Sequence, residues 1–142
     1  ATMGLNGFIA MGVRQDWATH MIGHEITALT GLTHGETLAI VLPALLRELL
    51  PQKRGKLLQY GERVWGVSAG TLDNRALTAI QHTEDFFRSI GLRTRLTECM
   101  GEAEAEALAD EIARRFTERG VAFGEDANVD GTVARAILER AK

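Results

Sequence analysis

Residues 16–43 read DWATHMIGHEITALTGLTHGETLAIVLP and hold two expected helices that meet at Gly31. His20 and His24 are four residues apart, so they share one face of the first helix. His34 follows the turn and returns from the next helix. Imidazole is the commonest side-chain ligand of zinc and iron at neutral pH. Three of the chain's four histidines lie in this stretch, which predicts a helical fold with a histidine site.

The rest of the chain continues the helical pattern, and we expect an all-α fold of about seven helices around one core. Apolar periodicity and glycine stops define the helices, which we expect at 2–11, 17–29, 35–50, 52–65, 73–90, 102–119 and 132–141. Asp16 and Asp130 are good N-caps. Pro43 should kink the third helix. Leu38–Leu42 could instead be a buried strand, although the residues that follow favour helix.

Two of these helices carry apolar residues that we expect to form buried stripes. In the fourth helix they are Leu57, Leu58, Val64 and Trp65. In the fifth they are Leu77, Ile80, Phe86, Phe87 and Ile90. Each set is expected to face the core, as in an amphipathic helix of a globular protein.

Length and composition fit a single globular domain over residues 1–142, with 45% apolar and 25% charged residues. The net charge of −3 includes no basic block, so nucleic-acid binding has no electrostatic support. Cys99 is the only cysteine, which excludes an internal disulfide and fits a reducing, cytoplasmic setting. The longest apolar run, Leu38–Leu46, is too short to span a membrane. The N-terminus starts within an apolar helical pattern, so we expect a chain cut from a longer protein.

Several familiar motifs fail when their spacing is checked. The zinc-protease motif needs a histidine four residues after the first one, and four residues after His24 is Ala28. The chain has no glycine-rich loop for nucleotide phosphates. Residues 126–131 imitate the start of a calcium loop, but the twelfth position, which needs a glutamate, is Ile137. Helix capping by Asp130 explains this segment without calcium.

The histidines also have a simpler interpretation, in which the i, i+4 pair lies at a helix surface and binds nothing. His34, placed just after a turn, favours a metal site. His82 is isolated in the fifth helix and is expected at the surface. The nearest acids are Asp16 and Glu25, but the first is better used as a helix cap. The second points about 100° away from His24 on a helix.

Residues 16–28 and 31–43, with the H-x3-H-x9-H-G spacing, resemble the metal-binding segment of the iron-containing (group III) alcohol dehydrogenases. The resemblance is closest to the butanol-dehydrogenase-like branch of NADPH-dependent aldehyde reductases. Residues 53–65, KRGKLLQYGERVW, also resemble that branch. The similarity is strong to Trp65 and looser from there to the C-terminal helix, and it concerns only the helical C-terminal domain of that family.

The resemblance implies roles for the three histidines. His20 and His34 would bind a divalent metal, iron or zinc, and His24 would lie beside substrate and nicotinamide as the catalytic residue. The family's N-terminal α/β domain binds NAD(P) and supplies the remaining metal ligands, an aspartate and a histidine. That domain is a necessary partner, because no such segment is present here. The substrate would be a small alcohol or aldehyde.

Two hypotheses follow for the function. The chain is either the metal-binding part of an alcohol dehydrogenase or aldehyde reductase, inactive by itself, or a stand-alone helical interaction module without catalysis. In the first case the histidine face is a cleft wall that the nucleotide-binding domain would seal. Trp17, Met21 and Leu38 would then be partly exposed and form an apolar patch. This patch should either be covered by another copy of the chain, giving a homo-oligomer, or make the protein prone to self-association.

Overall fold

The computed structural model describes residues 7–142, which form six α-helices and two short 3-10 turns. The α-helices are α2 (Ala18–Thr30), α3 (His34–Glu48), α4 (Leu50–Trp65), α5 (Leu72–Ser89), α6 (Glu102–Arg119) and α7 (Gly131–Arg140). The turns are η1 (Phe8–Ala10) and η2 (Leu96–Glu98). No β-strand occurs in this range; Phe123 and Val129 form an isolated bridge. The all-α prediction is confirmed.

The predicted boundaries hold for six of the seven helices to within two residues. Gly31 ends α2 with a φ of 76°, a left-handed conformation that favours glycine. The Asp130 carboxylate accepts the Val133 N–H and caps α7. The segment Leu38–Leu42 lies within α3, which continues through Pro43, so the strand alternative is wrong.

The first expected helix, over 2–11, is not confirmed. Residues 1–6 lie outside the described part of the chain, and the expected α-helix is wrong for the remainder, which forms only the turn η1. Gly7 before it has a φ of 71°, and Met11 after it is extended. Since both flanking residues leave the helical region, the apolar pattern here does not extend into a helix.

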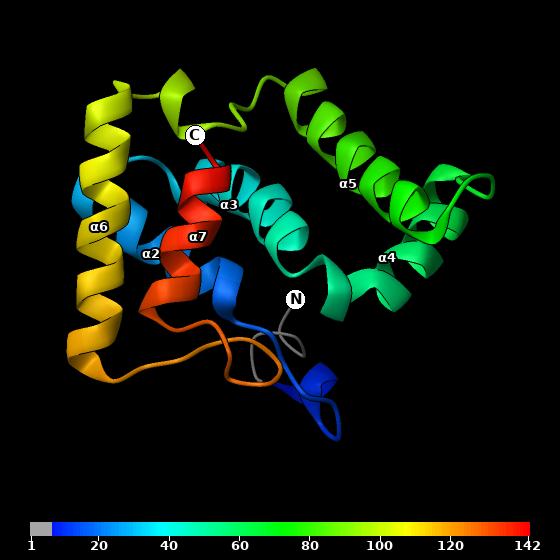
Figure 1. The fold of residues 1–142 in the computed structure, drawn as a ribbon, viewed down its shortest axis with the longest axis horizontal. Helices are drawn as coiled ribbons and strands as arrows, with labels where there is room; N and C mark the ends of the chain where they lie inside the picture. The colour runs from blue at the N-terminus through cyan, green and yellow to red at the C-terminus, as the bar shows by residue number, and fades with distance from the viewer. Residues whose placement is uncertain (1–6) are drawn as a thin grey trace.

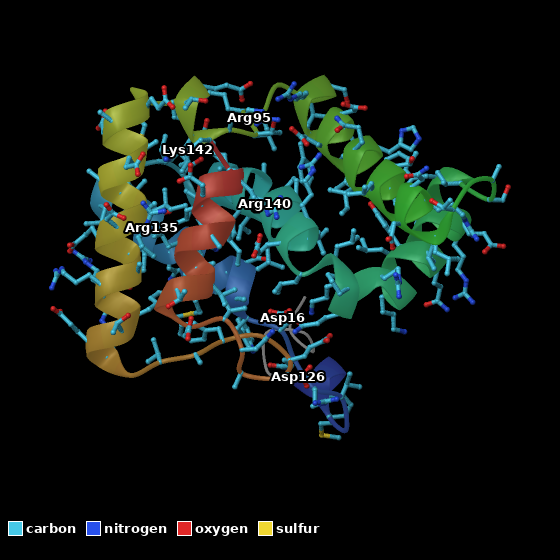
Figure 2. The ribbon with its side chains drawn as sticks, in the orientation of Figure 1. Asp16, Arg95, Asp126, Arg135, Arg140 and Lys142 are labelled. Atoms are coloured by element: carbon cyan, nitrogen blue, oxygen red, sulfur yellow. The ribbon has the colours of Figure 1, made fainter. Side chains whose placement is uncertain are left out.

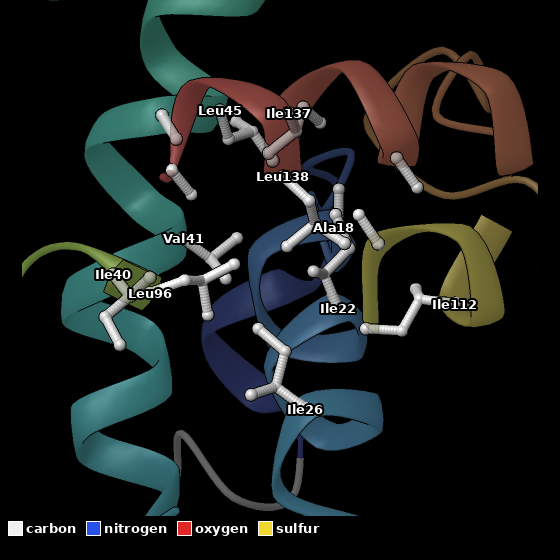
Figure 3. Close-up of a cluster of buried hydrophobic side chains, with 14 of the residues drawn as sticks. Ala18, Ile22, Ile26, Ile40, Val41, Leu45, Leu96, Ile112, Ile137 and Leu138 are labelled. Carbon is white, nitrogen blue, oxygen red and sulfur yellow. The ribbon is translucent and has the colours of Figure 1, made fainter. Parts of the chain in front are cut away.

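Helix α3 lies at the centre of the molecule and separates two groups of helices (Figure 1). It packs against α2 and α7 on one side and against the α4–α5 pair on the other. The larger core lies on the first side, and Figure 3 shows its side chains. Its fully buried members include Ile22, Ile26, Ile40, Val41, Leu45, Leu96, Ile112, Phe116, Ile137 and Leu138. A smaller core of Leu57, Ala76 and Ile80 joins α4 to α5.

The burial expected for α5 is partly wrong. Ile80 is buried, but Leu77, Phe86 and Ile90 are 40%, 48% and 58% exposed. On α4, Val64 is also exposed. The physical reason is that these two helices pack mainly against each other, so each buries only a narrow row of residues.

Ion pairs join neighbouring helices at the surface, and Figure 2 labels Arg135 and Lys142 among the charged side chains. Arg135 of α7 pairs with Asp110 and Glu106 of α6, and Lys142 pairs with Glu106 as well. Exposed pairs of this kind contribute little to stability singly. None of the helices in the described range has the length and apolar character needed to cross a membrane.

Candidate metal centre

The three histidines of residues 16–43 meet at one point, and we call them the histidine cluster. His20 and His24 lie on α2, and His34 is the first residue of α3, as predicted. One ring nitrogen from each lies within 4.8 Å of the other two. His34 Nε2 lies 3.1 Å from His20 Nδ1. The ring centroid of His24 lies 4.2 Å from that of His20 and 4.5 Å from that of His34.

Gly23 allows the two helices to bring this cluster together. It is buried on α2, and a Cβ atom there would stand 2.9 Å from Thr37 Oγ1 and 3.3 Å from Leu38 Cδ2. It would also stand 3.5 Å from His34 Cε1. The missing side chain therefore lets the first turn of α3 approach α2. Thr37 Oγ1 donates to the His34 carbonyl oxygen at 2.9 Å and fixes that turn.

The environment of His20 favours its neutral imidazole, the form that binds metal ions. Burial lowers the pKa of His20, and the nearby His24 and His34 lower it further, because adjacent positive charges would repel. His34 Nδ1 is buried and has no hydrogen-bond partner among residues 7–142. The cluster thus holds imidazole nitrogens whose hydrogen-bonding capacity the described chain does not fully use.

The spacing of the nitrogens fits a metal ion. Two nitrogens bound to the same ion at about 2.0–2.1 Å lie roughly 2.8–3.4 Å apart for bond angles between 90° and 109°. The distance of 3.1 Å between His34 Nε2 and His20 Nδ1 falls in this range. Two neutral imidazoles can also share a proton at this distance. The donor set therefore suits a divalent ion that takes nitrogen ligands.

A pocket of about 430 Å³ opens beside the cluster. His20 and Gly35 line it together with apolar side chains of α3 and of the region at the end of α5, namely Leu38, Leu42, Phe87 and Leu92. Trp17, whose ring meets His20 edge to face, is 49% exposed. Met21 and Leu38 are half-buried. The partial exposure predicted for these three residues is confirmed.

The acids near the cluster are used in ion pairs. Glu25 is buried, and its carboxylate accepts hydrogen bonds from Arg115, at 3.1 Å, and from Arg119. Asp16 accepts the Ala18 N–H and also pairs with Lys53 at 2.5 Å. These contacts agree with the expectation that neither acid belongs to the histidine cluster.

His82 lies apart from the cluster, as predicted. It is exposed on α5, where its ring lies 5.5 Å from that of Trp65. Its position makes it a natural control for the other three histidines.

Sequence reasoning missed Gly23 and the pocket residues Phe87 and Leu92. A signal existed for Gly23, because glycine inside a helix is costly unless another chain segment approaches closely. The pocket residues come from a different part of the sequence, 53 and 58 positions after His34. Local pattern holds no information about such a contact.

Comparison with known proteins gives a consistent result. The model of the Fe-containing alcohol dehydrogenase family, C-terminal part, matches residues 2–128. NADPH-dependent aldehyde reductase YqhD of Escherichia coli is 45% identical over 143 aligned positions, which cover 100% of this chain and 36% of that protein. A probable NADH-dependent butanol dehydrogenase of Bacillus subtilis is 34% identical, covering 97% of this chain and 35% of that protein.

Solved structures agree with these matches. A crystal structure of E. coli YqhD superimposes with a TM-score of 0.88 at 45% identity, over 99% of this chain and 36% of that chain. The fold and the matches together define an all-helical domain of the type found in alcohol dehydrogenases and aldehyde reductases. The chain belongs to the Fe-containing alcohol dehydrogenase family and corresponds to its C-terminal part. It spans about a third of the length of these relatives.

Proposed function

We propose that this chain is the metal-binding domain of an NAD(P)-dependent alcohol dehydrogenase or aldehyde reductase. The histidine cluster carries this proposal, since three imidazoles from two helices converge within 4.8 Å beside an apolar pocket. Family membership and the names of its relatives supply the reaction, hydride transfer between NAD(P)(H) and an alcohol or aldehyde.

In this proposal His20 and His34 hold a divalent ion, iron or zinc. Their facing nitrogens, 3.1 Å apart, support this assignment. When bound, such an ion supplies Lewis-acid chemistry that polarises a carbonyl oxygen or acidifies an alcohol. Two protein ligands leave a divalent ion incompletely coordinated, so further ligands must come from another domain.

His24 has a different role in the proposal. It is the most exposed of the three histidines, and its ring stands beside both others. An imidazole in this place can hold a proton at the substrate oxygen and exchange it with solvent. We therefore assign His24 to proton transfer and not to metal binding.

The nicotinamide cofactor requires an N-terminal nucleotide-binding domain as partner. Residues 1–142 contain no phosphate-binding glycine loop, and the relatives extend far beyond the matched part. We infer that the chain by itself has no NAD(P)-dependent activity. Homo-oligomerisation and a cytoplasmic location complete the proposal; the exposed Trp17 supports the first and the single free cysteine the second.

The decisive experiment is a chimera in which this chain replaces the matching part of E. coli YqhD. Restored NADPH-dependent reduction of butanal, with one equivalent of metal by mass spectrometry, supports the proposal. His20→Ala and His34→Ala should each abolish both metal and activity. His24→Ala should retain the metal while turnover falls about 10²- to 10⁴-fold, the usual range for an acid–base residue.

His82→Ala is the matched control and should leave metal content and turnover unchanged. If His24→Ala empties the site as completely as His20→Ala, the roles within the cluster are wrong. A folded chimera that neither binds metal nor catalyses NADPH-dependent reduction of butanal would favour the alternative of a non-catalytic interaction module.

A further inference from the structure

One stripe of α3 leads away from the histidine cluster. His34, Leu38, Leu42 and Leu46 follow each other at intervals of four residues, so they lie on one face of the helix. Each interval advances about 6 Å along the axis. The stripe thus begins at the cluster and extends over apolar side chains for about 18 Å.

The pocket beside the cluster follows the first part of this stripe. Its lining includes Leu38 and Leu42 of α3, and Phe87 and Leu92 close it from the α5 side. A second pocket, of about 250 Å³, follows the continuation of the stripe between α3, α4 and α5. It is lined by Leu42 and Leu46, and by Leu57 and Tyr60 of α4.

Leu42 belongs to the lining of both pockets and therefore stands between them. An ion pair also contributes to the wall between the two pockets. Asp16 lines the first pocket, Lys53 lines the second, and the two side chains pair with each other. Lys53 also pairs with Glu125 at 3.2 Å, so its charge is already matched. The half-buried Leu42 side chain is the uncharged part of this wall.

Both pockets suit an apolar occupant. In the second pocket, the hydroxyls of Tyr60 and Thr83 hydrogen-bond to each other at 2.8 Å. Among the described residues, none of the buried side-chain polar atoms that lack a partner belongs to either lining. The charged side chains of Asp16 and Lys53 pair with each other, and the other polar lining residues, Thr19, His20 and Lys56, stand among leucine, alanine and phenylalanine side chains. A hydrocarbon chain can therefore lie against the apolar part of each lining without breaking a hydrogen bond.

We propose that the first pocket binds the unbranched hydrocarbon chain of an aliphatic alcohol or aldehyde, and that Leu42 sets the greatest chain length it accepts. The reacting oxygen lies at the histidine end, a placement that rests on the proposed function. Removing the Leu42 side chain would join the two pockets and extend the acceptable chain toward Leu46. Leu42 is thus a specificity-determining residue and not a catalytic one.

The test is a nuclear magnetic resonance titration of the whole 142-residue chain with 1-butanol, 1-hexanol, 1-octanol and 1-decanol. It needs neither metal nor nucleotide, so its outcome is separate from that of the chimera. Affinity should increase about fourfold for each methylene group that becomes buried. In the original protein, affinity should stop increasing beyond one chain length. The amide signals of Leu38, Phe87 and Leu92 should shift on binding.

In Leu42→Ala the increase should continue to longer alcohols, and the shifts should spread to Tyr60 and Thr83. Leu42→Phe, which adds bulk, should move the limit to shorter alcohols. Leu58→Ala on α4 removes a half-buried leucine outside both linings and should keep the original limit. An unchanged limit in both Leu42 variants, or shifts away from the two pockets, would overturn the proposal while leaving the dehydrogenase assignment untouched.

Discussion

Gly23 shows how one absent side chain can shape a site. It lies between His20 and His24, and a Cβ there would come within 2.9 Å of Thr37 Oγ1. The threonine hydroxyl is not free to move, because it donates to the His34 carbonyl oxygen. Any residue larger than glycine must therefore push α3 away from α2 or break this hydrogen bond.

We predict that Gly23→Ala destabilises the protein by about 1–3 kcal/mol, the usual cost of overpacking. This result would oppose the ordinary preference of helices for alanine over glycine, about 0.5–1 kcal/mol. Urea denaturation followed by circular dichroism measures the change.

Gly35→Ala is the matched comparison on α3. An added Cβ at Gly35 meets open space, so this variant should be neutral or more stable by up to about 1 kcal/mol. Equal stability losses in the two variants would show that close packing at Gly23 is not the cause.

Some individual residues of the site could be predicted from the sequence, and others could not. The histidine spacing predicted the cluster, because i, i+4 geometry and a following turn are local properties. The length of the α2–α3 turn fixed where His34 returns. Leu42 was hidden as a pocket residue, since its role depends on α4 and α5, which pack against α3 from more distant parts of the sequence.

At the scale of elements, Glu25 ties α2 to α6. Its buried carboxylate accepts from Arg115 and Arg119, near the end of the long α6. Since it directly follows His24, this tie also fixes the rotation of α2 beneath the histidine cluster.

We predict that Glu25→Ala costs about 1–3 kcal/mol, as expected for hydrogen bonds to charged groups with one buried partner. Glu25→Gln should lose less, because its amide oxygen still accepts. Thermal unfolding monitored at 222 nm gives both values.

Glu118 offers a control on the same helix, since it pairs with Arg114 at the surface. Glu118→Ala should cost less than about 1 kcal/mol. A cost for Glu25→Ala no greater than this would contradict a tying role.

A carboxylate of α6 leads us to predict that the stability of the protein depends on pH. Hydrogen bonds from Arg114 and Arg115 lower the pKa of Glu111 from 4.5 to about 2. A pKa that is lower in the folded state means that the stabilisation is complete above the unfolded-state value and is lost as the pH falls through the folded one. Unfolding free energy should therefore decrease between about pH 4.5 and pH 2.

Glu111→Gln should make this decrease shallower, as measured by urea denaturation at several pH values. Glu104→Gln removes a carboxylate of α6 that has no ion pair within residues 7–142, and should leave the slope as it was. The prediction would be contradicted if unfolding free energy changed equally with pH in the original protein, in Glu111→Gln and in Glu104→Gln.

Element boundaries were the most predictable part of the fold. Glycine stops such as Gly31, and caps such as Asp130, act within a few residues, so sequence alone located them. The burial of α5 was less predictable. Phe86 and Ile90 are apolar yet exposed, because burial depends on which neighbours a helix finds and not on its own composition.

For the whole molecule, we predict weak metal binding by the isolated chain. The histidine cluster supplies imidazoles from this chain only, and water must complete the coordination. Titration with Co²⁺ should give a weak visible absorption that His20→Ala and His34→Ala remove and His82→Ala preserves. Metal retained through dialysis against a chelator would contradict the assignment of a shared site.

The position of α3 between two cores has a consequence for motion. Among the described residues, the core of the α4–α5 hairpin is small: it consists of Leu57, Ala76 and Ile80, with Ala79 also buried, whereas α2, α6 and α7 share a much larger core. Hydrogen exchange of backbone amides should therefore divide the chain into two units, with the hairpin opening more often than the rest. The hairpin forms the outer wall of the second pocket. That pocket should therefore open and close by local motion of the hairpin, while the helices that carry the histidine cluster remain closed.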